Sequence, residues 1–449
     1  MTGSGFDPAS VTSFTVTRTS FDATDRTLRL EYCFDESLAF VETITFTTPT
    51  AYSRTRDQDA ALMRAILLLH ATAGVSYYKC AAPDLIRLTQ PLGEHTCREL
   101  EGVYGPGLHE FAAANGLPLP FLPAIECEVD RHHPLAASRL PDRWCIPLGG
   151  GKDSLVALEA LKELEPFALA INPKPWVVEQ AERAGVPLIT VTRTLDPLMI
   201  QLSGSGGLNG HIPVTAVNTA IAVVGAYLYG YSRIGLAIES SASEPTRLID
   251  GIPVNHQWSK SRDAEALMQD AVREDVDPGV FVGSVLRGFT ELAITRRFAS
   301  LPQYHDLFVS CNAAYRKDAT GLRWCGECPK CRFITLMCAP YCSREKLTAI
   351  FGRSLLDDPS AIPGFRMLFA EDKPYECVGE RRESAYAMTL LAKDPAWQES
   401  HVVKALAREA GTVPGVDMGS SLLEGDPEYR TLIPESERIW SFLGGVSAR

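Results

Sequence analysis

The chain has 449 residues, of which 45% are hydrophobic and 22% charged, a composition typical of a globular protein with two or three domains. Its formal net charge of -12 argues against nucleic acid as a partner, because an acidic protein repels a phosphate backbone. The longest nearly apolar stretch, 220–231, is shorter than the roughly 20 residues of a membrane-spanning helix, and no secretory signal is evident. We therefore expect a cytoplasmic protein, without membrane insertion, that acts on a small molecule.

The N-terminal part of the chain has the pattern of a small sheet followed by a helix. Residues 12–47 alternate apolar and polar positions, with a turn at 22–25, which predicts antiparallel strands. A helical pattern follows over 60–73 and ends at Gly74. The segment 131–134, Arg-His-His-Pro, interrupts the pattern, so we place a soft boundary there, closing an α+β domain over 1–130.

From Trp144 onward, short apolar strands alternate with helices. The predicted elements, in chain order, are strand 144–148, helix 154–164, strand 167–171, helix 177–184, strand 187–191, helix 214–231 and strand 233–239. A βαβαβ run of this kind predicts a parallel sheet covered by helices on both faces. We assign it to a domain over 131–344. After it, helical patterns at 344–351 and 380–391 predict a helical C-terminal region over 345–449.

A glycine-rich loop lies between the first strand and the first helix of this run. Its residues are Gly149, Gly150, Gly151, Lys152, Asp153 and Ser154. Glycines let backbone N–H groups close on an anion, and the helix N-terminus adds partial positive charge. Asp153 stands where a Walker A loop needs Ser or Thr, and the Rossmann pattern Gly-x-Gly-x-x-Gly is absent. The loop therefore predicts phosphate binding, with a capped glycine turn as the purely structural alternative.

The same loop resembles the signature Ser-Gly-Gly-x-Asp-Ser of the PP-loop ATP pyrophosphatase superfamily, with Gly149 in place of the first serine. The resemblance implies an adenine nucleotide α hydrolase-like parallel sheet, and ATP cleavage between the α and β phosphates while the loop holds the departing pyrophosphate. Asp153 would help to hold Mg²⁺, Ser154 would donate to a phosphate and Lys152 would add charge. Because Gly149 lacks the usual hydroxyl, only its backbone can contribute.

Four cysteines have the spacing of a metal site. Cys325, Cys328 and Cys331 are each separated by two residues, and Cys311 upstream can supply a fourth thiolate. Four sulfurs suit a closed, structural Zn²⁺ site, with an iron–sulfur cluster or unligated thiols as alternatives. The 7-cyano-7-deazaguanine synthases, which are PP-loop enzymes, carry a similar late four-cysteine site. Cys338 and Cys342, further along, are expected to be core residues.

Six further segments narrow the resemblance. They are 74–79 (GVSYYK), 209–214 (NGHIPV), 239–245 (ESSASEP), 254–260 (VNHQWSK), 304–306 (YHD) and 373–377 (KPYEC). In this order they resemble the bacterial UDP-N-acetylmuramoyl-L-alanyl-L-glutamate epimerases of peptidoglycan precursor synthesis, over about residues 13–395. The resemblance implies inversion of the terminal L-glutamate of a UDP-muramoyl dipeptide through an acyl-adenylate, with ATP converted to AMP and pyrophosphate.

These segments contain the candidate residues for substrate binding and proton transfer. His256 and His211 are candidates for proton transfer or substrate binding, although a lone histidine is more often structural. Glu239 and Glu244 lie at and just past a predicted strand end, where ligands bind in open α/β sheets, with solvated loop acids as the alternative. Lys260 is a candidate phosphate ligand, with a surface charge as the alternative. The sequence assigns no specific base, no oligomeric state and no UDP-binding domain.

Other functions of the same superfamily remain open from the sequence. A ligase or synthase similar to 7-cyano-7-deazaguanine synthase would let ammonia attack the adenylate, but no glutaminase domain is evident. A tRNA-thiolating enzyme is disfavoured by the acidic charge. A non-catalytic ATP-sensing module would bind the nucleotide without turnover.

Overall fold

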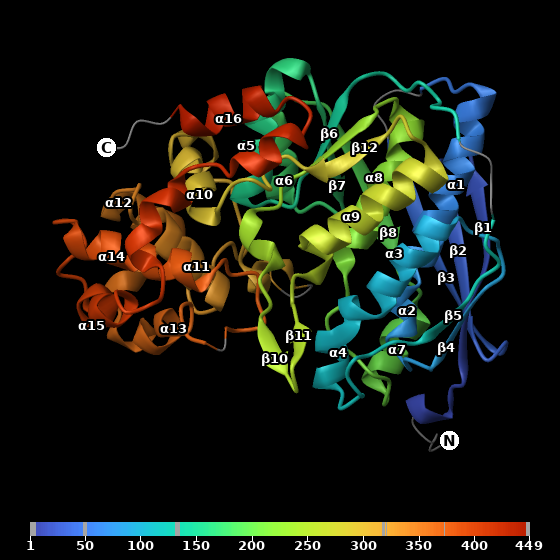
Figure 1. Cartoon of the computed structure of the whole chain (residues 1–449), viewed down its shortest axis with the longest axis horizontal. Coiled ribbons are helices and arrows are strands. Elements are labelled where there is room, and N and C mark those ends of the chain that lie inside the picture. Colours follow the sequence, from blue (N-terminus) through green and yellow to red (C-terminus); the bar gives the residue numbers. More distant parts are fainter. Residues whose placement is uncertain are drawn as a thin grey trace.

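The computed structural model describes residues 6–47, 52–130, 135–316, 319, 321–371 and 373–445. A ten-stranded sheet runs through one part of the molecule, and a group of helices forms the other end (Figure 1). The strand order in the sheet is β12-β9-β6-β7-β8-β3-β2-β1-β4-β5. The strands are β1 (Ser13–Asp22), β2 (Thr27–Phe34), β3 (Leu38–Thr47), β4 (Leu85–Leu88), β5 (Ala124–Glu126), β6 (Trp144–Pro147), β7 (Phe167–Ile171), β8 (Leu188–Thr194), β9 (Arg233–Leu236) and β12 (Phe281–Ser284), with a separate hairpin of β10 (Arg247–Ile249) and β11 (Ile252–Val254).

Helices cover this sheet and form the C-terminal end. They are α1 (Arg56–Ala73), α2 (Val75–Tyr78), α3 (Glu94–Tyr104), α4 (His109–Ala114), α5 (Lys152–Leu161), α6 (Pro175–Ala184), α7 (Pro197–Gly204), α8 (Val214–Tyr229), α9 (Arg262–Asp270), α10 (Glu291–Ala299), α11 (Pro329–Cys338), α12 (Arg344–Phe351), α13 (Ile362–Arg366), α14 (Arg381–Lys393), α15 (His401–Ala410) and α16 (Ser436–Gly444). The predicted α/β class is confirmed. The finer assignment to the PP-loop fold stays a prediction.

The N-terminal strands extend the parallel part of the sheet. Strands β12, β9, β6, β7 and β8 are parallel, as the βαβαβ pattern predicts. Strands β1, β2 and β3 form the predicted antiparallel set, and β3 pairs antiparallel with β8, so that Thr43 lies opposite Thr194. The division that we predict near residue 130 falls at 131–134, outside the described residues. It stays a prediction, although one sheet includes strands from both sides of it.

The core follows from the alternation of the strands and from two apolar helices. On β3, Phe40, Ile44 and Phe46 are buried on alternate positions, and α1 and α8 pack together against the sheet. The helical stretch 56–78 is long and apolar enough to span a membrane by composition alone, but 78% of its most apolar window is buried inside the protein. This helical stretch therefore belongs to the core of the protein.

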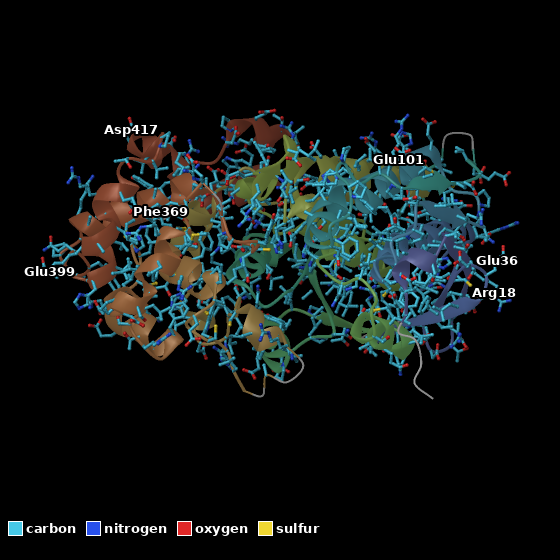
Figure 2. The ribbon with its side chains drawn as sticks, turned by 90° about the horizontal axis from the view of Figure 1, so that it is seen from below. Arg18, Glu36, Glu101, Phe369, Glu399 and Asp417 are labelled. Carbon is cyan, nitrogen blue, oxygen red and sulfur yellow. The ribbon has the colours of Figure 1, made fainter. Side chains whose placement is uncertain are left out.

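The predicted C-terminal helices are also present. Helix α12 has the predicted bounds, and α14 begins one residue later than the predicted segment 380–391 and ends two residues later. Together with α10, α11, α13 and α15 they enclose a second apolar core. Seen from below, Phe369 and Glu399 mark this helical end, and Arg18 and Glu36 mark the opposite end, where the N-terminal strands lie (Figure 2).

Candidate functional site

The glycine loop lies at the point where the sheet reverses its direction of growth. After β6 the chain adds β7 and β8 on one side, and later β9 and β12 on the other. Ligands of open α/β sheets bind at such switch points, beyond the carboxyl ends of the strands. Residues 148–151 connect β6 to the N-terminus of α5 there. The predicted loop is therefore at the position where a nucleotide phosphate would meet a helix N-terminus.

The conformation of the loop requires glycine at one position. Gly150 has φ +89°, and a Cβ there would lie 2.3 Å from the hydroxyl of Tyr315. The loop carbonyls are held from behind: the Tyr315 hydroxyl donates to Gly149 (2.7 Å), and the Gln180 amide and the Val309 N–H both donate to Gly150 (2.9 Å each). The two backbone carbonyls are thus fixed to α6 and to Val309 and Tyr315, which lie on either side of Cys311.

Three carboxylates meet beside this loop. Asp153 is in the first turn of α5, Glu239 follows β9, and Glu291 begins α10 after β12. One oxygen from each lies within 4.8 Å of the others. Lys152 is fully buried, and its ammonium contacts Asp153 Oδ1 (2.5 Å) and Glu291 Oε2. Three carboxylates with one ammonium in direct contact form a site of oxygen donors, which suits a divalent cation such as Mg²⁺.

Burial sets the protonation of this acidic cluster. Desolvation and the nearby Asp153 raise the pKa of Glu291 to about 7, although Lys152 opposes the shift. Burial by itself would lower the pKa of Lys152, but Asp153 and Glu291 outweigh that effect and hold its pKa above the ordinary value. A bound cation would favour the ionised form of Glu291. Sequence reasoning missed Glu291, although its place at a helix N-terminus that follows Thr290, a capping residue, was a usable signal.

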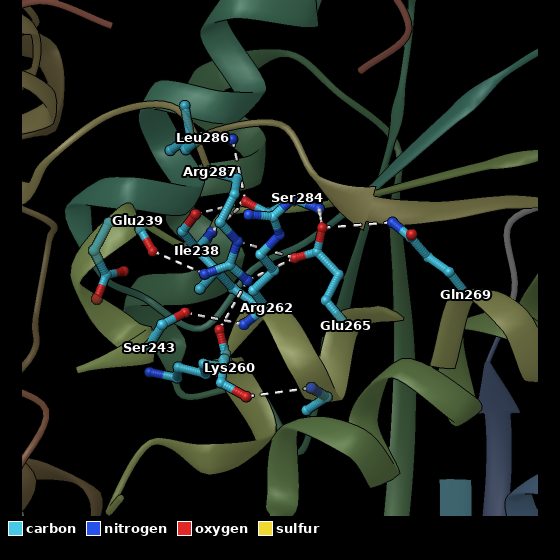
Figure 3. A network of polar contacts seen from close by, with 12 residues as sticks. Ile238, Glu239, Ser243, Lys260, Arg262, Glu265, Gln269, Ser284, Leu286 and Arg287 are labelled. Carbon is cyan, nitrogen blue, oxygen red and sulfur yellow. Dashed lines mark hydrogen bonds and ion pairs between the residues drawn. The ribbon is translucent and has the colours of Figure 1, made fainter. Parts of the chain in front are cut away.

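A buried arginine fixes the backbone that carries Glu239 and Lys260 (Figure 3). Arg287 is 2% exposed and donates to the carbonyl of Glu239 (3.0 Å) and to the carbonyl of Lys260 (2.8 Å). Glu265 balances its charge at 2.6 Å. In Figure 3 the side chains of Glu239 and Lys260 extend to the same side of this network. Arg287 thereby places a carboxylate and an ammonium beside each other at the strand ends.

The two predicted histidines lie together, with two partners that the sequence analysis did not assign. The rings of His211 and His256 are 4.2 Å apart between centroids. Glu110 of α4 lies 2.6 Å from His256 Nδ1, and Cys377 is near enough to His256 to act on its charge. Lys260 Nζ is 3.6 Å from Cys377 Sγ. Three of the predicted residues thus form one cluster, which Glu110 and Cys377 complete.

These contacts shift the charges within the cluster. Burial works to lower the pKa of His256, but its bonds to Cys377 and Glu110 outweigh burial and raise that pKa to about 9. Burial works to raise the pKa of Cys377, but the charge of Lys260 and the bond from His256 lower it to about 6. The pKa of His211 falls to about 4 because of burial and the positive His256. At neutral pH the cluster therefore holds a thiolate beside an imidazolium and an ammonium, with a neutral His211.

The segments that carry the resemblance contact one another. Lys79 donates to Asn209 (2.8 Å), and Lys260 reaches Cys377. Lys373 binds the carboxylate of Glu244, so that Glu244 serves here as an ion-pair partner. These pairs join segments that are far apart in the chain, which supports a single site.

The four predicted metal ligands come together. Their Sγ atoms lie within 4.8 Å of one another, with Cys311 to Cys328 at 3.9 Å, Cys325 to Cys331 at 3.8 Å and Cys328 to Cys331 at 3.5 Å. A tetrahedral site with Zn–S bonds of about 2.3 Å has sulfurs roughly 3.8 Å apart. Backbone N–H groups also donate to the sulfurs of Cys311, Cys325 and Cys331, as thiolates require. The donor set and its spacing fit a tetrahedral metal ion.

Three further residues lie near these cysteines in the sequence: His305, Cys338 and Cys342. His305 bonds the Phe298 carbonyl through Nε2 (3.1 Å) and packs on the Phe298 ring, so its contacts are with α10. Cys338 is buried in α11, as predicted. Cys342, also expected in the core, is only partly buried.

Comparison with known proteins gives a consistent result. Residues 5–281 match the model of the MurL N-terminal domain, and residues 307–419 match that of the MurL C-terminal domain. A protein of Salinispora tropica named UDP-N-acetyl-alpha-D-muramoyl-L-alanyl-L-glutamate epimerase is 40% identical over 412 residues, or 88% of each chain. Two further relatives have the same name. The protein of Micromonospora sp. is 41% identical over 83% of this chain and 84% of its own length. The protein of Xanthomonas oryzae pv. oryzae is 38% identical over 90% of this chain and 91% of its own length. A search of solved structures found no match.

Proposed function

Since the chain belongs to the MurL family, whose curated relatives are named epimerases, we propose that it inverts the terminal L-glutamate of UDP-N-acetylmuramoyl-L-alanyl-L-glutamate at the expense of ATP. The product would be the D-glutamyl dipeptide of peptidoglycan precursor synthesis. The observation that carries the ATP requirement is the glycine loop at the switch point of the sheet, beside three carboxylates. Resemblance to the PP-loop superfamily makes AMP and pyrophosphate the expected nucleotide products.

The chemistry of the substrate explains a need for ATP. The α-proton of glutamate is hard to remove while the carboxylate is ionised, because a second negative charge must form beside the first. Attack of that carboxylate on the α-phosphate of ATP forms an acyl-adenylate and releases pyrophosphate, which removes the carboxylate charge. A base of ordinary strength can then take the α-proton, and the charge that develops on the carbonyl oxygen needs positive or donor groups nearby. Return of a proton to the other face and hydrolysis would give the D-centre.

The described residues divide this work as follows. The backbone of Gly149, Gly150 and Gly151 would face the pyrophosphate, and the hydroxyl of Ser154 would donate to it. Asp153, Glu239 and Glu291 would hold Mg²⁺, which supplies positive charge to the phosphates. Lys260 would balance negative charge on the activated substrate. Lys152 contacts two of the carboxylates, so its role would be to keep the acidic cluster together before the cation binds.

We also propose that Cys311, Cys325, Cys328 and Cys331 hold a structural Zn²⁺ ion. Zinc would close the loop that follows Cys311; Tyr315 in that loop braces Gly149, and Val309, just before Cys311, braces Gly150. The metal would therefore act on nucleotide binding through the position of that segment. Four sulfur ligands leave no open position for chemistry at such a site.

One experiment tests the reaction. The protein is incubated in D₂O with ATP, Mg²⁺ and the UDP-muramoyl L-Ala-L-Glu dipeptide, and the chirality and deuterium content of the glutamate are measured together with the nucleotide products. D-glutamate carrying solvent deuterium, formed only with ATP and accompanied by AMP and pyrophosphate, is expected. Asp153→Asn should abolish all of these signals. ADP as the main nucleotide product, or deuterium uptake without ATP, would contradict the adenylate route.

A further inference from the structure

Cys377 occupies the centre of the cluster between the histidines and the acidic site. Its sulfur lies 3.6 Å from Lys260 Nζ and is close enough to the His256 imidazole to affect its charge. His256 in turn is held by Glu110, at 2.6 Å from Nδ1. Glu110 belongs to α4, His256 and Lys260 lie in the segment before α9, and Cys377 lies in the loop before α14. A thiol, an imidazole and a carboxylate in series form the arrangement that activates nucleophiles in enzymes.

The charges around Cys377 favour the thiolate. Two cations face the sulfur, while Glu110 orients the imidazolium from the far side and stabilises its charge. The lowered pKa of Cys377, about 6, agrees with this geometry. Cys145, a buried thiol in β6, has the opposite shift: burial raises its pKa to about 12. Cys377 is therefore prepared for chemistry in a way that a core cysteine is not.

The position of Cys377 also places it near the activated substrate. The negative charges of Cys377, Glu239 and Asp153 all act on the ammonium of Lys260. One cation therefore balances charge at both the sulfur and the acidic cluster. Arg287 fixes the backbone of both Lys260 and Glu239. An acyl-adenylate made over the glycine loop would thus have a thiolate within the same site.

We propose, building on the adenylation above, that Cys377 is a catalytic nucleophile that takes the glutamyl group from AMP as a thioester. The thiolate attacks the activated carbonyl, the new C–S bond forms, and the C–O bond to the phosphate breaks with its electron pair leaving on AMP. The α-proton is then removed, with its electron pair delocalised onto the thioester oxygen, and a proton is added to the opposite face. Water finally cleaves the C–S bond, which regenerates the carboxylate and the thiolate and releases two protons.

The thiolate of Cys377 and the two cations beside it would each act at more than one step of this reaction. A thiolate of low pKa is both stable enough to exist at neutral pH and a good leaving group when water cleaves the thioester. The cationic His256 and Lys260 can also stabilise negative charge that develops on the thioester oxygen. A covalently held glutamyl group cannot leave between loss and return of its α-proton, which explains why a nucleophile is useful in an epimerase.

The test separates adenylation from thioester formation. Wild-type protein is mixed with MgATP and the dipeptide, quenched in acid and examined by intact mass and peptide mapping. We expect an adduct of the dipeptide substrate minus one water on Cys377, removable by hydroxylamine. Cys377→Ala should keep dipeptide-dependent exchange of pyrophosphate into ATP, which also shows that it is folded, but should lose the adduct and D-glutamate formation on the order of 10⁴-fold. Cys377→Ser should accumulate a slowly hydrolysed ester, and Cys97→Ser should behave as wild type.

The outcomes are distinguishable. Dipeptide-dependent release of AMP by Cys377→Ala at the wild-type rate would overturn the proposal, because the adenylate would then be consumed without the thiol. Formation of D-glutamate by that variant at the wild-type rate would overturn it as well. Absence of dipeptide-dependent pyrophosphate exchange in the wild type would instead refute the adenylation on which the proposal rests.

Discussion

Arg287→Met tests how the candidate site is held in place. Arg287 is the buried hub that joins the carbonyls of Glu239 and Lys260 to the carboxylate of Glu265. Methionine keeps much of the apolar stem of the side chain but removes the guanidinium. The substitution therefore leaves Glu265 without its cation and the two carbonyls without their donor, while the packing changes little.

The size of the effect follows from burial. The side chains of Arg287 and Glu265 are 3% and 13% exposed, and removing one partner of such a pair costs about 3–5 kcal/mol because the remaining charge is uncompensated. Glu265 keeps the Ser284 N–H at 3.1 Å, which places the expected loss near the lower limit, at about 3 kcal/mol. Adding Glu265→Gln removes the stranded charge, so the double variant should lose less stability than Arg287→Met alone.

Urea unfolding followed by circular dichroism measures these losses. Arg262→Met is the matched control, because the Arg262–Glu428 pair lies at 3.4 Å with side chains 54% and 65% exposed, and solvent screens such an exposed pair so that its loss should change stability little. Pyrophosphate exchange should also fall in Arg287→Met as Glu239 and Lys260 lose their fixed positions. Equal stability losses for the two arginine variants would refute the assignment of Arg287 as the hub.

Three further predictions concern other parts of the chain. Burial lowers the folded-state pKa of His70 to about 4, below its unfolded value, so only the unfolded chain gains a proton as the pH falls through 6. His70 should therefore contribute a loss of about 2 kcal/mol of unfolding free energy between pH 7 and pH 5, so the change between these two pH values in urea titrations should differ by about that amount between the wild type and His70→Phe. Cys328→Ser should lose zinc in elemental analysis and lower the melting temperature; full retention of zinc would contradict the ligand set. Gly150→Ala should weaken ATP binding in calorimetry, because its Cβ would lie 2.3 Å from a tyrosine hydroxyl, whereas Gly149→Ser meets nothing within 4 Å at its Cβ and should leave stability unchanged.

Local sequence patterns predicted most of the fold, because apolar residues in these strands and helices recur with the spacing of a strand or of a helix. The alternation in 12–47 and the βαβαβ run both appear in the structure at nearly the expected bounds. Helix α1 begins earlier than expected, because Thr55 and Gln58 form a capping box that the apolar pattern does not contain. The pairing of β3 with β8 was not predictable, since it depends on which of several strand edges meet after folding.

The site was predictable where one segment contains the whole signal. The glycine loop and the four cysteines have spacings that specify their chemistry, and Glu239 follows a strand end. Glu110 gave no such signal, because it lies in a short helix and meets His256 only through tertiary packing. Cys377 was part of a segment used for resemblance, yet its reactivity depends on Lys260 and His256, which are more than a hundred residues away in the chain.

The junction of the two halves gives a last prediction, on a fragment of residues 131–449. In the whole chain, Thr190–Thr194 of β8 pair with β3, and Glu110 holds His256. The fragment would expose β8 as an unpaired edge, and such edges promote aggregation. We therefore expect it to be insoluble or to elute as aggregates in gel filtration, while the whole chain elutes as a defined species. A soluble fragment with cooperative unfolding would show instead that the division near residue 130 is a true domain boundary, and that the continuous sheet is a docked interface between independently stable parts.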